Sequence, residues 1–186
     1  MCEGGRTLDA RRGAGDGDDA AQAFVRWFEV LAPKAYGAAL AMLGEREAAE
    51  DVVAEAFARA WARWGRVRRL RSPDGYLFRI VFRLGFDEAR RRTRPGFGDR
   101  EPADVAGSGH ADQVETKVEL EEALLRLPLR QRAAVLLLDF LDLDSGAAGR
   151  AMGVRAGTVR RLASLGRAWL RALMAEEGGE GDGTDR

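Results

Sequence analysis

The 186-residue sequence contains one cysteine, Cys2, and one histidine, His110. A disulfide bond within the chain needs a second cysteine, and a zinc site of the common kind needs several Cys and His ligands. Both are excluded, so we expect neither a metal nor another cofactor. The sequence also shows no nucleophile paired with a base and no glycine-rich phosphate loop. An enzyme is therefore the class of protein that the sequence favours least.

Long apolar runs are also absent. No apolar stretch approaches the roughly 18 residues of a membrane-spanning helix. Asp16, Asp18 and Asp19 occupy the segment in which a signal peptide would carry its apolar core. We therefore expect a cytoplasmic protein without membrane insertion.

Lysine is scarce, because only two of the thirty basic residues are lysine. The formal net charge is zero, yet the charges are segregated along the chain. Residues 59–94 contain twelve arginines and three acidic residues, and residues 145–175 contain six arginines and no acidic residue, whereas residues 99–122 are acidic. Basic blocks of this kind attract polyanions, chiefly nucleic acid or anionic membrane surfaces. A solvated face in an arginine-rich composition is the simpler alternative.

The distribution of apolar residues predicts an all-α protein made of two small helical domains joined by a flexible acidic linker. Residues 1–19 show no periodicity and are predicted to be a disordered tail, and residues 176–186 an acidic tail. Helical periodicity fills residues 20–95 and 118–175. Residues 96–117 are rich in Gly, Pro, Asp and Ala, which is typical of a linker.

Three helices are predicted in the first domain. One starts near Ala20 and is interrupted by Pro33. The second covers residues 47–64 and is acidic at its start and basic at its end, as the helix dipole favours. The third begins with Ser72 as N-cap and a proline in the first helical position.

Five aromatic residues of this domain are expected in its core. Phe78, Phe82 and Phe86 recur at i, i+4 and i+8 in the stretch GYLFRIVFRLGFDEARRR, the spacing of one helix face. Trp61 and Trp64 lie on the apolar stripe of the preceding helix.

Four helices are predicted in the second domain: residues 118–127, residues 130–141, a third capped by Ser145, and a fourth over residues 155–176. The last two, joined by a turn at Gly153, have the dimensions of a helix-turn-helix. In the fourth helix the periodicity predicts an inward-facing set and a polar arginine face. The inward-facing set is Val159, Leu162, Gly166, Trp169 and Leu173.

The order of these segments resembles that of a known family. EAAEDVVAEAFARAWARWGRVRRL, GYLFRIVFRLGFDEARRR, ALLRLPLRQRAAVLLLDFL and MGVRAGTVRRLASLGRAWLRALM are similar to the sigma-70 RNA polymerase specificity subunits of the extracytoplasmic-function (ECF) group. The resemblance covers about residues 22–95, called region 2 in the family, and residues 118–174, called region 4. It implies a sigma factor that directs core polymerase to the minus-ten and minus-thirty-five promoter elements and aids transcription initiation.

The resemblance also implies partners and site residues. Core RNA polymerase would bind through its β′ clamp helices and β flap, promoter DNA would bind both regions, and an anti-sigma protein is a further implied partner. The polymerase contacts would be Glu50, Asp51, Val52 and Glu55. The minus-ten contacts would be Arg66, Arg68, Arg69, Arg71, Tyr76, Arg79, Arg83, Arg90, Arg91 and Arg92. The minus-thirty-five contacts would be Arg155, Thr158, Arg160, Arg161, Ser164 and Arg167.

The physical reason for rings and arginines in region 2 is strand separation. Exposed bases need an aromatic surface to stack on, and single-stranded phosphates need cations. Tyr76, beside the basic loop, is the ring expected to contact DNA. In region 4, arginine side chains on the last helix can contact guanine or phosphate in the major groove.

The sequence departs from the family pattern at several positions. Ala54 replaces the usual glutamine, and Leu84 replaces the usual asparagine of the DNA helix. Residues 147–149 read Ala-Ala-Gly where the family has Glu-Ile-Ala. Gly149 and the small Ala148 predict looser packing of region 4 or an atypical promoter.

Two other functions fit the same pattern. One is a stand-alone helix-turn-helix regulator that binds DNA without polymerase, and the other is a helical adaptor or sequestering protein. A further hypothesis is that the acidic linker and tail fold over the basic blocks and suppress DNA binding, with solubility as the simpler role of these charges.

Overall fold

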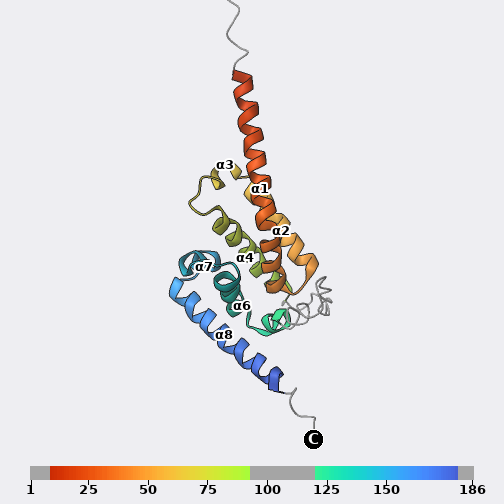
Figure 1. The fold of residues 1–186 in the computed structure, drawn as a ribbon, viewed down its shortest axis with the longest axis vertical. Coiled ribbons are helices and arrows are strands. Elements are labelled where there is room, and N and C mark those ends of the chain that lie inside the picture. Colours follow the sequence, from red (N-terminus) through yellow and green to blue (C-terminus); the bar gives the residue numbers. More distant parts are fainter. Residues whose placement is uncertain (1–8, 93–119, 180–186) are drawn as a thin grey trace, which may run out of the picture.

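The computed structural model describes residues 9–92 and 120–179 (Figure 1). All regular secondary structure in these two ranges is helical, which confirms the predicted all-α fold. The expected linker of residues 96–117 and the final residues of the acidic tail lie outside the described ranges. No helix in the described part of the chain is both long and apolar enough to cross a membrane.

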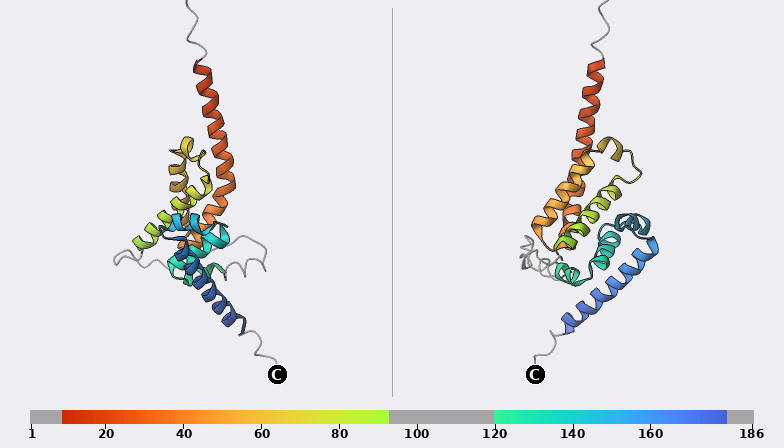
Figure 2. Two further views of the ribbon diagram at one scale, coloured as in Figure 1. Left: turned by 90° about the vertical axis from the view of Figure 1, so that its left-hand side faces the viewer. Right: turned by 180° about the vertical axis from the view of Figure 1, so that it is seen from behind.

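Residues 9–92 form an N-terminal module of four helices: α1 (Asp9–Leu43), α2 (Arg46–Trp61), α3 (Trp64–Val67) and α4 (Pro73–Arg92). Figure 2 shows that the first part of α1 extends beyond the other helices. α1, α2 and α4 pack against one another in a bundle.

The predicted start of α1 and its interruption are both wrong. The helix begins at Asp9, within the segment expected to be disordered, and Pro33 lies inside it. Extending a helix from a packed segment costs little once the helix has nucleated. Pro33 is exposed, so the carbonyl that loses its N–H partner lies on the solvent side and can bind water.

Alanines bring the helices of the bundle close together. Ala35 and Ala38 of α1 and Ala56 of α2 are completely buried, and small side chains at such contacts allow helix axes to approach. At Gly85 of α4 a Cβ atom would lie 2.8 Å from Sδ of Met42, so a larger residue there would displace the buried Met42 side chain.

The aromatic residues confirm most of the predicted core. Phe78 and Phe82 are buried, whereas Phe86 is only partly buried. Trp64 is buried, but the prediction for Trp61 is wrong because it is 49% exposed. Trp61 lies at the end of α2, where its ring packs on Phe24 of α1 with 4.8 Å between the ring centroids.

The rings of Phe24, Trp27, Trp61 and Trp64 lie in contact where α1 meets the end of α2 and the start of α3. Two hydrogen bonds also hold this cluster in place. Trp64 donates from Nε1 to the carbonyl oxygen of Ala20 at 2.7 Å. Trp27 donates from Nε1 to Oδ1 of Asp74 at 2.7 Å, which links α1 to the first turn of α4. Both indole N–H groups therefore have a partner, as buried polar groups require.

Residues 120–179 form a C-terminal module. Residues 120–126 are helical and are followed by α6 (Leu129–Val135), the π-helix η1 (Leu136–Phe140), α7 (Ser145–Met152) and α8 (Ala156–Gly179). Gly153 has φ 67° and ends α7, as predicted for the turn of a helix-turn-helix. α8 packs against both α6 and α7.

Two predictions for this module need correction. Asp144, not Ser145, caps α7, because its Oδ1 accepts from the backbone N–H groups of Gly146 and Ala147 at 2.8 Å. Trp169 is 37% exposed, and Leu170 is buried in its place. The other members of the predicted stripe, up to Leu173, are buried or packed against the core, so only the position of Trp169 is wrong.

The predicted loose packing around Gly149 is also wrong. Ala148 and Gly149 are buried, and a Cβ atom at Gly149 would lie 2.7 Å from the carbonyl oxygen of Val154. The backbone of the turn thus packs directly on α7. Glycine at this position is a condition of tight packing, not a defect.

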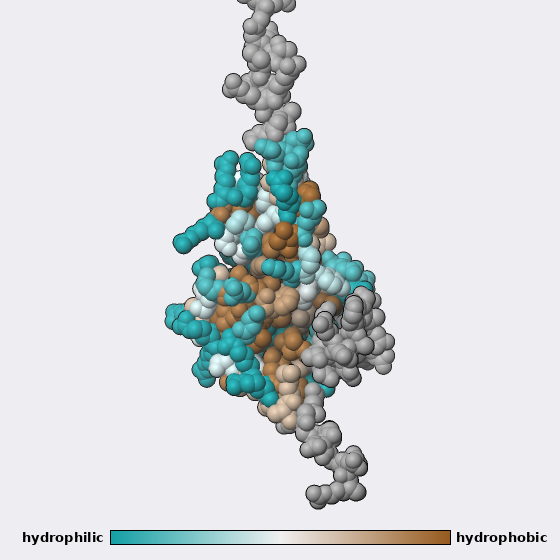
Figure 3. Space-filling model, viewed as in Figure 1, coloured by the Kyte–Doolittle hydropathy of each residue, from teal (hydrophilic) through white to brown (hydrophobic). Residues whose placement is uncertain are grey.

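The two modules pack against each other, and one cluster of buried residues runs through both. α4 packs against α7, and α1 contacts α6 and η1. Figure 3 shows hydrophobic residues along the middle of one face of the molecule, with hydrophilic residues on either side. Gly44, with φ 72°, lies at the junction, where an added Cβ would meet the side chain of Leu125 at 2.8 Å.

Arg132 joins the modules through the backbone. Its guanidinium group donates to the carbonyl oxygen of Met42 in the last turn of α1 at 2.5 Å, and to those of Leu125 and Leu127. The residue is 9% exposed, and burial lowers its pKa to about 10. It therefore remains a buried cation at neutral pH, held by carbonyl oxygens.

Candidate nucleic-acid interface

The start of α4 positions Tyr76 beside the basic loop. The hydroxyl of Ser72 accepts from the N–H of Gly75 at 3.1 Å, which confirms the predicted N-cap. A Cβ atom at Gly75 would lie 2.7 Å from that hydroxyl oxygen, so glycine suits the cap. Tyr76 is half-buried and lines a cavity of about 630 Å³ together with Arg71 and Arg79.

α3 and the loop that joins it to α4 carry four arginines. Arg66, Arg69 and Arg71 are exposed, whereas Arg68 is half-buried and has an interaction partner. Three cations and the Tyr76 ring thus share one end of the N-terminal module, the combination that single-stranded nucleic acid requires.

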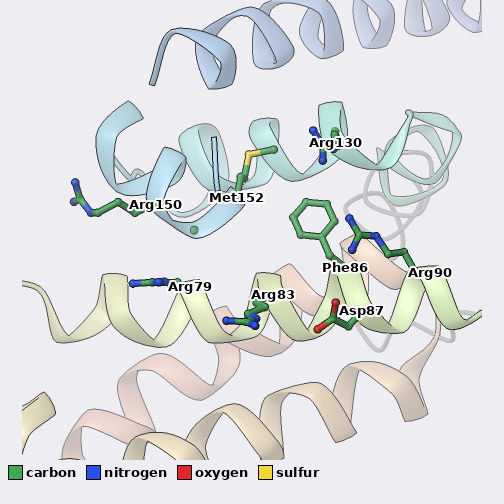
Figure 4. Close-up of a pocket in the computed structure, with 10 residues that line it drawn as sticks. Arg79, Arg83, Phe86, Asp87, Arg90, Arg130, Arg150 and Met152 are labelled. Atoms are coloured by element: carbon green, nitrogen blue, oxygen red, sulfur yellow. The ribbon is translucent and has the colours of Figure 1, made fainter. Parts of the chain in front are cut away.

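Three further arginines lie along one face of α4. Arg79, Arg83 and Arg90 are exposed and line a cavity of about 330 Å³. Figure 4 shows this face directed towards α6 and α7, with the Phe86 ring rising from α4 into the gap. In this arrangement the C-terminal module lies opposite the predicted minus-ten face of α4, across the cavity.

The last two arginines of α4 have acidic partners. Arg91 pairs with Glu88 at 3.0 Å, and Arg92 pairs with both Glu88 and Glu45. Arg92 is partly buried and connects the end of α4 to the residue before α2. Its predicted DNA contact therefore competes with an ion-pair network inside the module.

The acidic face of α2 is only partly available to a partner. Glu50 and Asp51 are exposed, and Glu55 is exposed but pairs with Arg59 at 2.6 Å. Val52 is mostly buried in the module, at 6% exposure, and lines the cavity that adjoins this acidic face.

A third cavity, of about 300 Å³, adjoins this acidic face. It is lined by Asp51 and Glu55, and also by Glu47, which the sequence analysis did not single out. Leu84 lines the same cavity and is half-buried. The departure from asparagine therefore lies beside the acidic face of α2, away from the arginine face of α4.

The predicted reading face of α8 is mostly exposed. Thr158, Arg161 and Ser164 are exposed, and the structure shows no interaction that would hold the Arg161 side chain within the described residues. Arg155 is exposed in the turn before α8. Arg160 donates from Nη1 to the hydroxyl of Ser145 at 3.0 Å and so bridges the two helices of the helix-turn-helix.

Arg167 differs from its neighbours because it is already paired. Its Nε and Nη2 donate to the two carboxylate oxygens of Asp139 at 2.8 and 2.9 Å. This hydrogen bonding raises the pKa of Arg167 above its usual value, so its charge is fixed. The periodicity of α8 could not reveal this partner, which lies in η1.

Comparison with known proteins assigns both modules to one family. Residues 27–95 match the family described as Sigma-70 region 2, and residues 117–170 match Sigma-70, region 4. The two matches together cover more than half of the chain, in the order predicted. The chain belongs to the sigma-70 family, in its ECF group. The predicted resemblance is therefore confirmed, and the N-terminal and C-terminal modules are regions 2 and 4.

Curated relatives support the same group. The ECF RNA polymerase sigma factor SigE of Mycolicibacterium smegmatis is 33% identical over 88% of this chain and 66% of its own length. SigM of Mycobacterium tuberculosis is 33% identical over 69% of this chain and 65% of its own length. SigW of Bacillus subtilis is 26% identical over 83% of this chain and 90% of its own length. The chain thus spans about two thirds of the first two of these relatives.

Two solved structures share the fold. One is the sigma factor RpoE in complex with the anti-sigma factor NepR from Bartonella quintana, with a TM-score of 0.68 and 21% identity, covering 83% of this chain and 98% of that one. The other is CnrH in complex with the cytosolic domain of CnrY, with a TM-score of 0.61 and 21% identity, covering 84% and 90% of the two chains.

Proposed function

We propose that this chain is a sigma factor, a subunit without catalysis of its own that directs core RNA polymerase to promoters in the cytoplasm. The observation that carries the proposal is the pairing of regions 2 and 4 in one chain, each with an exposed arginine face. Arginine forks bind phosphate and guanine bidentately, which suits both backbone and base contacts.

Region 2 would bind the minus-ten element. The loop arginines would hold the phosphates of the separated strand, and Tyr76 would provide the surface on which an unpaired base stacks. Arg79, Arg83 and Arg90 would extend this contact along α4. Because α7 packs against α4 and faces these arginines across a cavity of only about 330 Å³, region 4 must move away before DNA can lie along them.

Region 4 would bind the minus-thirty-five element through α8. Residues at the start of a recognition helix reach base edges, and later residues contact phosphates. Arg155, Thr158 and Arg161 are placed for the first task, and Ser164 for the second. Arg160 and Arg167 can join only by leaving Ser145 and Asp139.

Polymerase would bind the acidic face of α2 through Glu50, Asp51 and Glu55. These carboxylates lie on the exposed side of a helix whose opposite side is buried, so they are fixed in position without being neutralised in the interior. A basic surface on the polymerase clamp would complement them.

A partner that inhibits the chain is part of the proposal. The structures of RpoE and CnrH are complexes with an anti-sigma factor and with CnrY. We propose that an anti-sigma protein binds this chain in an equivalent way.

The decisive experiment is transcription with purified core polymerase from bacteria. The chain should support initiation at a promoter selected from a genomic library, and the chain alone should bind the same DNA weakly. Arg161→Ala should lower the yield of transcripts about tenfold, because a base or phosphate contact is worth roughly 1–3 kcal/mol. Arg26→Ala, an exposed arginine of α1, is the matched control and should have no effect.

The same experiment separates the alternatives. Tight, sequence-specific binding by the isolated chain would support a stand-alone regulator. Association with polymerase without any promoter-dependent transcription, unchanged in Arg161→Ala, would support an adaptor. Failure of the chain to bind core polymerase at moderate ionic strength would remove the proposal.

A further inference from the structure

The cavity of about 330 Å³ between the modules gathers arginines from three helices (Figure 4). Arg79, Arg83 and Arg90 come from α4, Arg130 from α6 and Arg150 from α7. Their side chains share one small space although they are far apart in the sequence. Of the predicted functional residues, only those of α4 are among them, so Arg130 and Arg150 are not accounted for by promoter binding.

The positive charge of this cavity is poorly compensated. Among the described residues that line it, Asp87 is the only acidic one. Within the described residues, Arg79, Arg83 and Arg130 form no ion pair with a carboxylate. Like charges brought together in a confined space repel one another, and the repulsion is relieved when an anion enters.

Two further carboxylates lie close by. Asp142 and Asp144 line the adjoining cavity, which shares Arg79 and Arg150 with the first. Asp144 already accepts two backbone hydrogen bonds as the N-cap of α7, and these bonds lower its pKa. The excess of arginine therefore remains at the α4 and α6 side of the gap.

Size and lining define the ligand. The volume is at the small end of the range for small-molecule sites, which is roughly 300–1,000 Å³, and cannot hold a duplex. Planar guanidinium groups bind phosphate oxygens in pairs, and several of them suit adjacent phosphates. Phe86 and Met152 add an apolar surface on which a flat ring can lie.

We propose that this cavity binds a compact oligophosphate, either free or carried by a nucleotide, which bridges α4 of region 2 to α6 and α7 of region 4. Such a ligand holds the two regions together by neutralising arginines on both sides of the gap. It also occupies Arg79 and Arg83. This last consequence rests on the proposed function, because those residues are placed there at the minus-ten element.

The test is isothermal titration calorimetry of the full chain at low salt with sodium tripolyphosphate, ATP and GTP. We expect saturable binding with one ligand per chain. The double variant Arg130→Gln/Arg150→Gln should weaken it at least about tenfold, because two phosphate contacts are lost. The double variant Arg26→Gln/Arg63→Gln removes the same charge from exposed positions outside the cavity and should bind as the original chain does.

The two sources of the phosphate group are separated by Phe86→Leu. A free oligophosphate should bind this variant unchanged, whereas a nucleotide should bind it more weakly because its base loses the ring. Circular dichroism of each variant establishes that it remains folded.

Absence of saturable binding, or equal weakening in both double variants, would overturn the proposal. Neither polymerase nor promoter is present in the titration. A failure of the sigma-factor proposal would therefore leave this result intact, and a failure here would leave transcription unaffected.

Discussion

Arg132 is the residue on which the contact between the two regions most depends. Its guanidinium group donates to three carbonyl oxygens from both regions. Within the described residues its Nε has no hydrogen-bond partner and no carboxylate neutralises it. A buried cation of this kind is costly unless its hydrogen bonds are kept. The interface therefore tolerates little change at this position.

We expect Arg132→Met to destabilise the chain by about 2–4 kcal/mol, because buried carbonyl oxygens lose their donor. Urea unfolding followed by circular dichroism measures the change. Arg130→Met, on the same helix but exposed, is the control and should differ from the original chain by less than about 0.5 kcal/mol. An unchanged midpoint for Arg132→Met would show that the inter-region hydrogen bonds contribute nothing to stability.

Gly149 provides a second test at the same scale. Gly149→Ala should destabilise the fold by about 1–3 kcal/mol, because its Cβ would collide with the carbonyl of Val154. Gly157→Ala is the matched control, since Gly157 is exposed in α8 and an added Cβ there has its nearest contact at 4.0 Å. It should be neutral or slightly stabilising. Thermal unfolding of the two variants separates the cost of the steric clash from the gain in helix propensity that alanine brings. An increase in thermal stability for Gly149→Ala would contradict the structure.

Among the helices, η1 restrains α8. Its five residues follow α6 directly, and Asp139 within it holds the guanidinium group of Arg167. The pair is exposed, so it contributes little to stability. The ion pair matters because it keeps the Arg167 side chain bound to Asp139 and so unavailable to DNA.

We expect Asp139→Asn to strengthen binding of the chain to DNA. Release of Arg167 adds about one phosphate contact, so the slope of log K against log salt should become steeper by roughly 0.9. Fluorescence anisotropy with a labelled duplex at several salt concentrations measures the slope. Asp142→Asn removes the same charge from an exposed residue nearby and should leave the slope unchanged, apart from a small uniform gain in affinity.

Element boundaries were predictable where capping chemistry defines them. Ser72 with the following proline predicted the start of α4, and Gly153 predicted the end of α7. The start of α1 was not, because helix propagation beyond a packed segment leaves no local signal. The inward stripe of α8 was displaced at Trp169, since periodicity alone does not show where a partner helix ends.

For the whole molecule, the contact between regions was the least predictable feature. The hydrogen bond from Arg132 to Met42 joins residues 90 positions apart. Nothing in either local pattern specifies that pairing, and the sequence instead suggested two separately tethered domains. The candidate site followed the same rule: residues on α4 and α8 were found from their spacing, whereas Arg130 and Arg150 join the cavity only through tertiary packing.

The facing arginines predict a salt-dependent shape. Raising the ionic strength should bring the two regions closer, because salt screens the repulsion among the arginines of the cavity. Energy transfer between dyes on Gln22→Cys and Ala172→Cys, with Cys2 replaced by serine, measures the separation; both positions are exposed. The Arg130→Gln/Arg150→Gln variant should lose most of the response. A separation that grows with salt would mean that attraction, not repulsion, dominates the gap.

The hydrophobic core is shared by the two regions, so it cannot be completed until the second region has been synthesised. Residues of α1, α2 and α4 leave the ribosome before any of α6, α7 or α8 exists, and translation of the remaining half takes on the order of ten seconds. For that interval the surface of region 2 that will receive Arg132 and its neighbours is uncovered. The nascent first half is thus a transient target for chaperones, which the arrival of the second half removes.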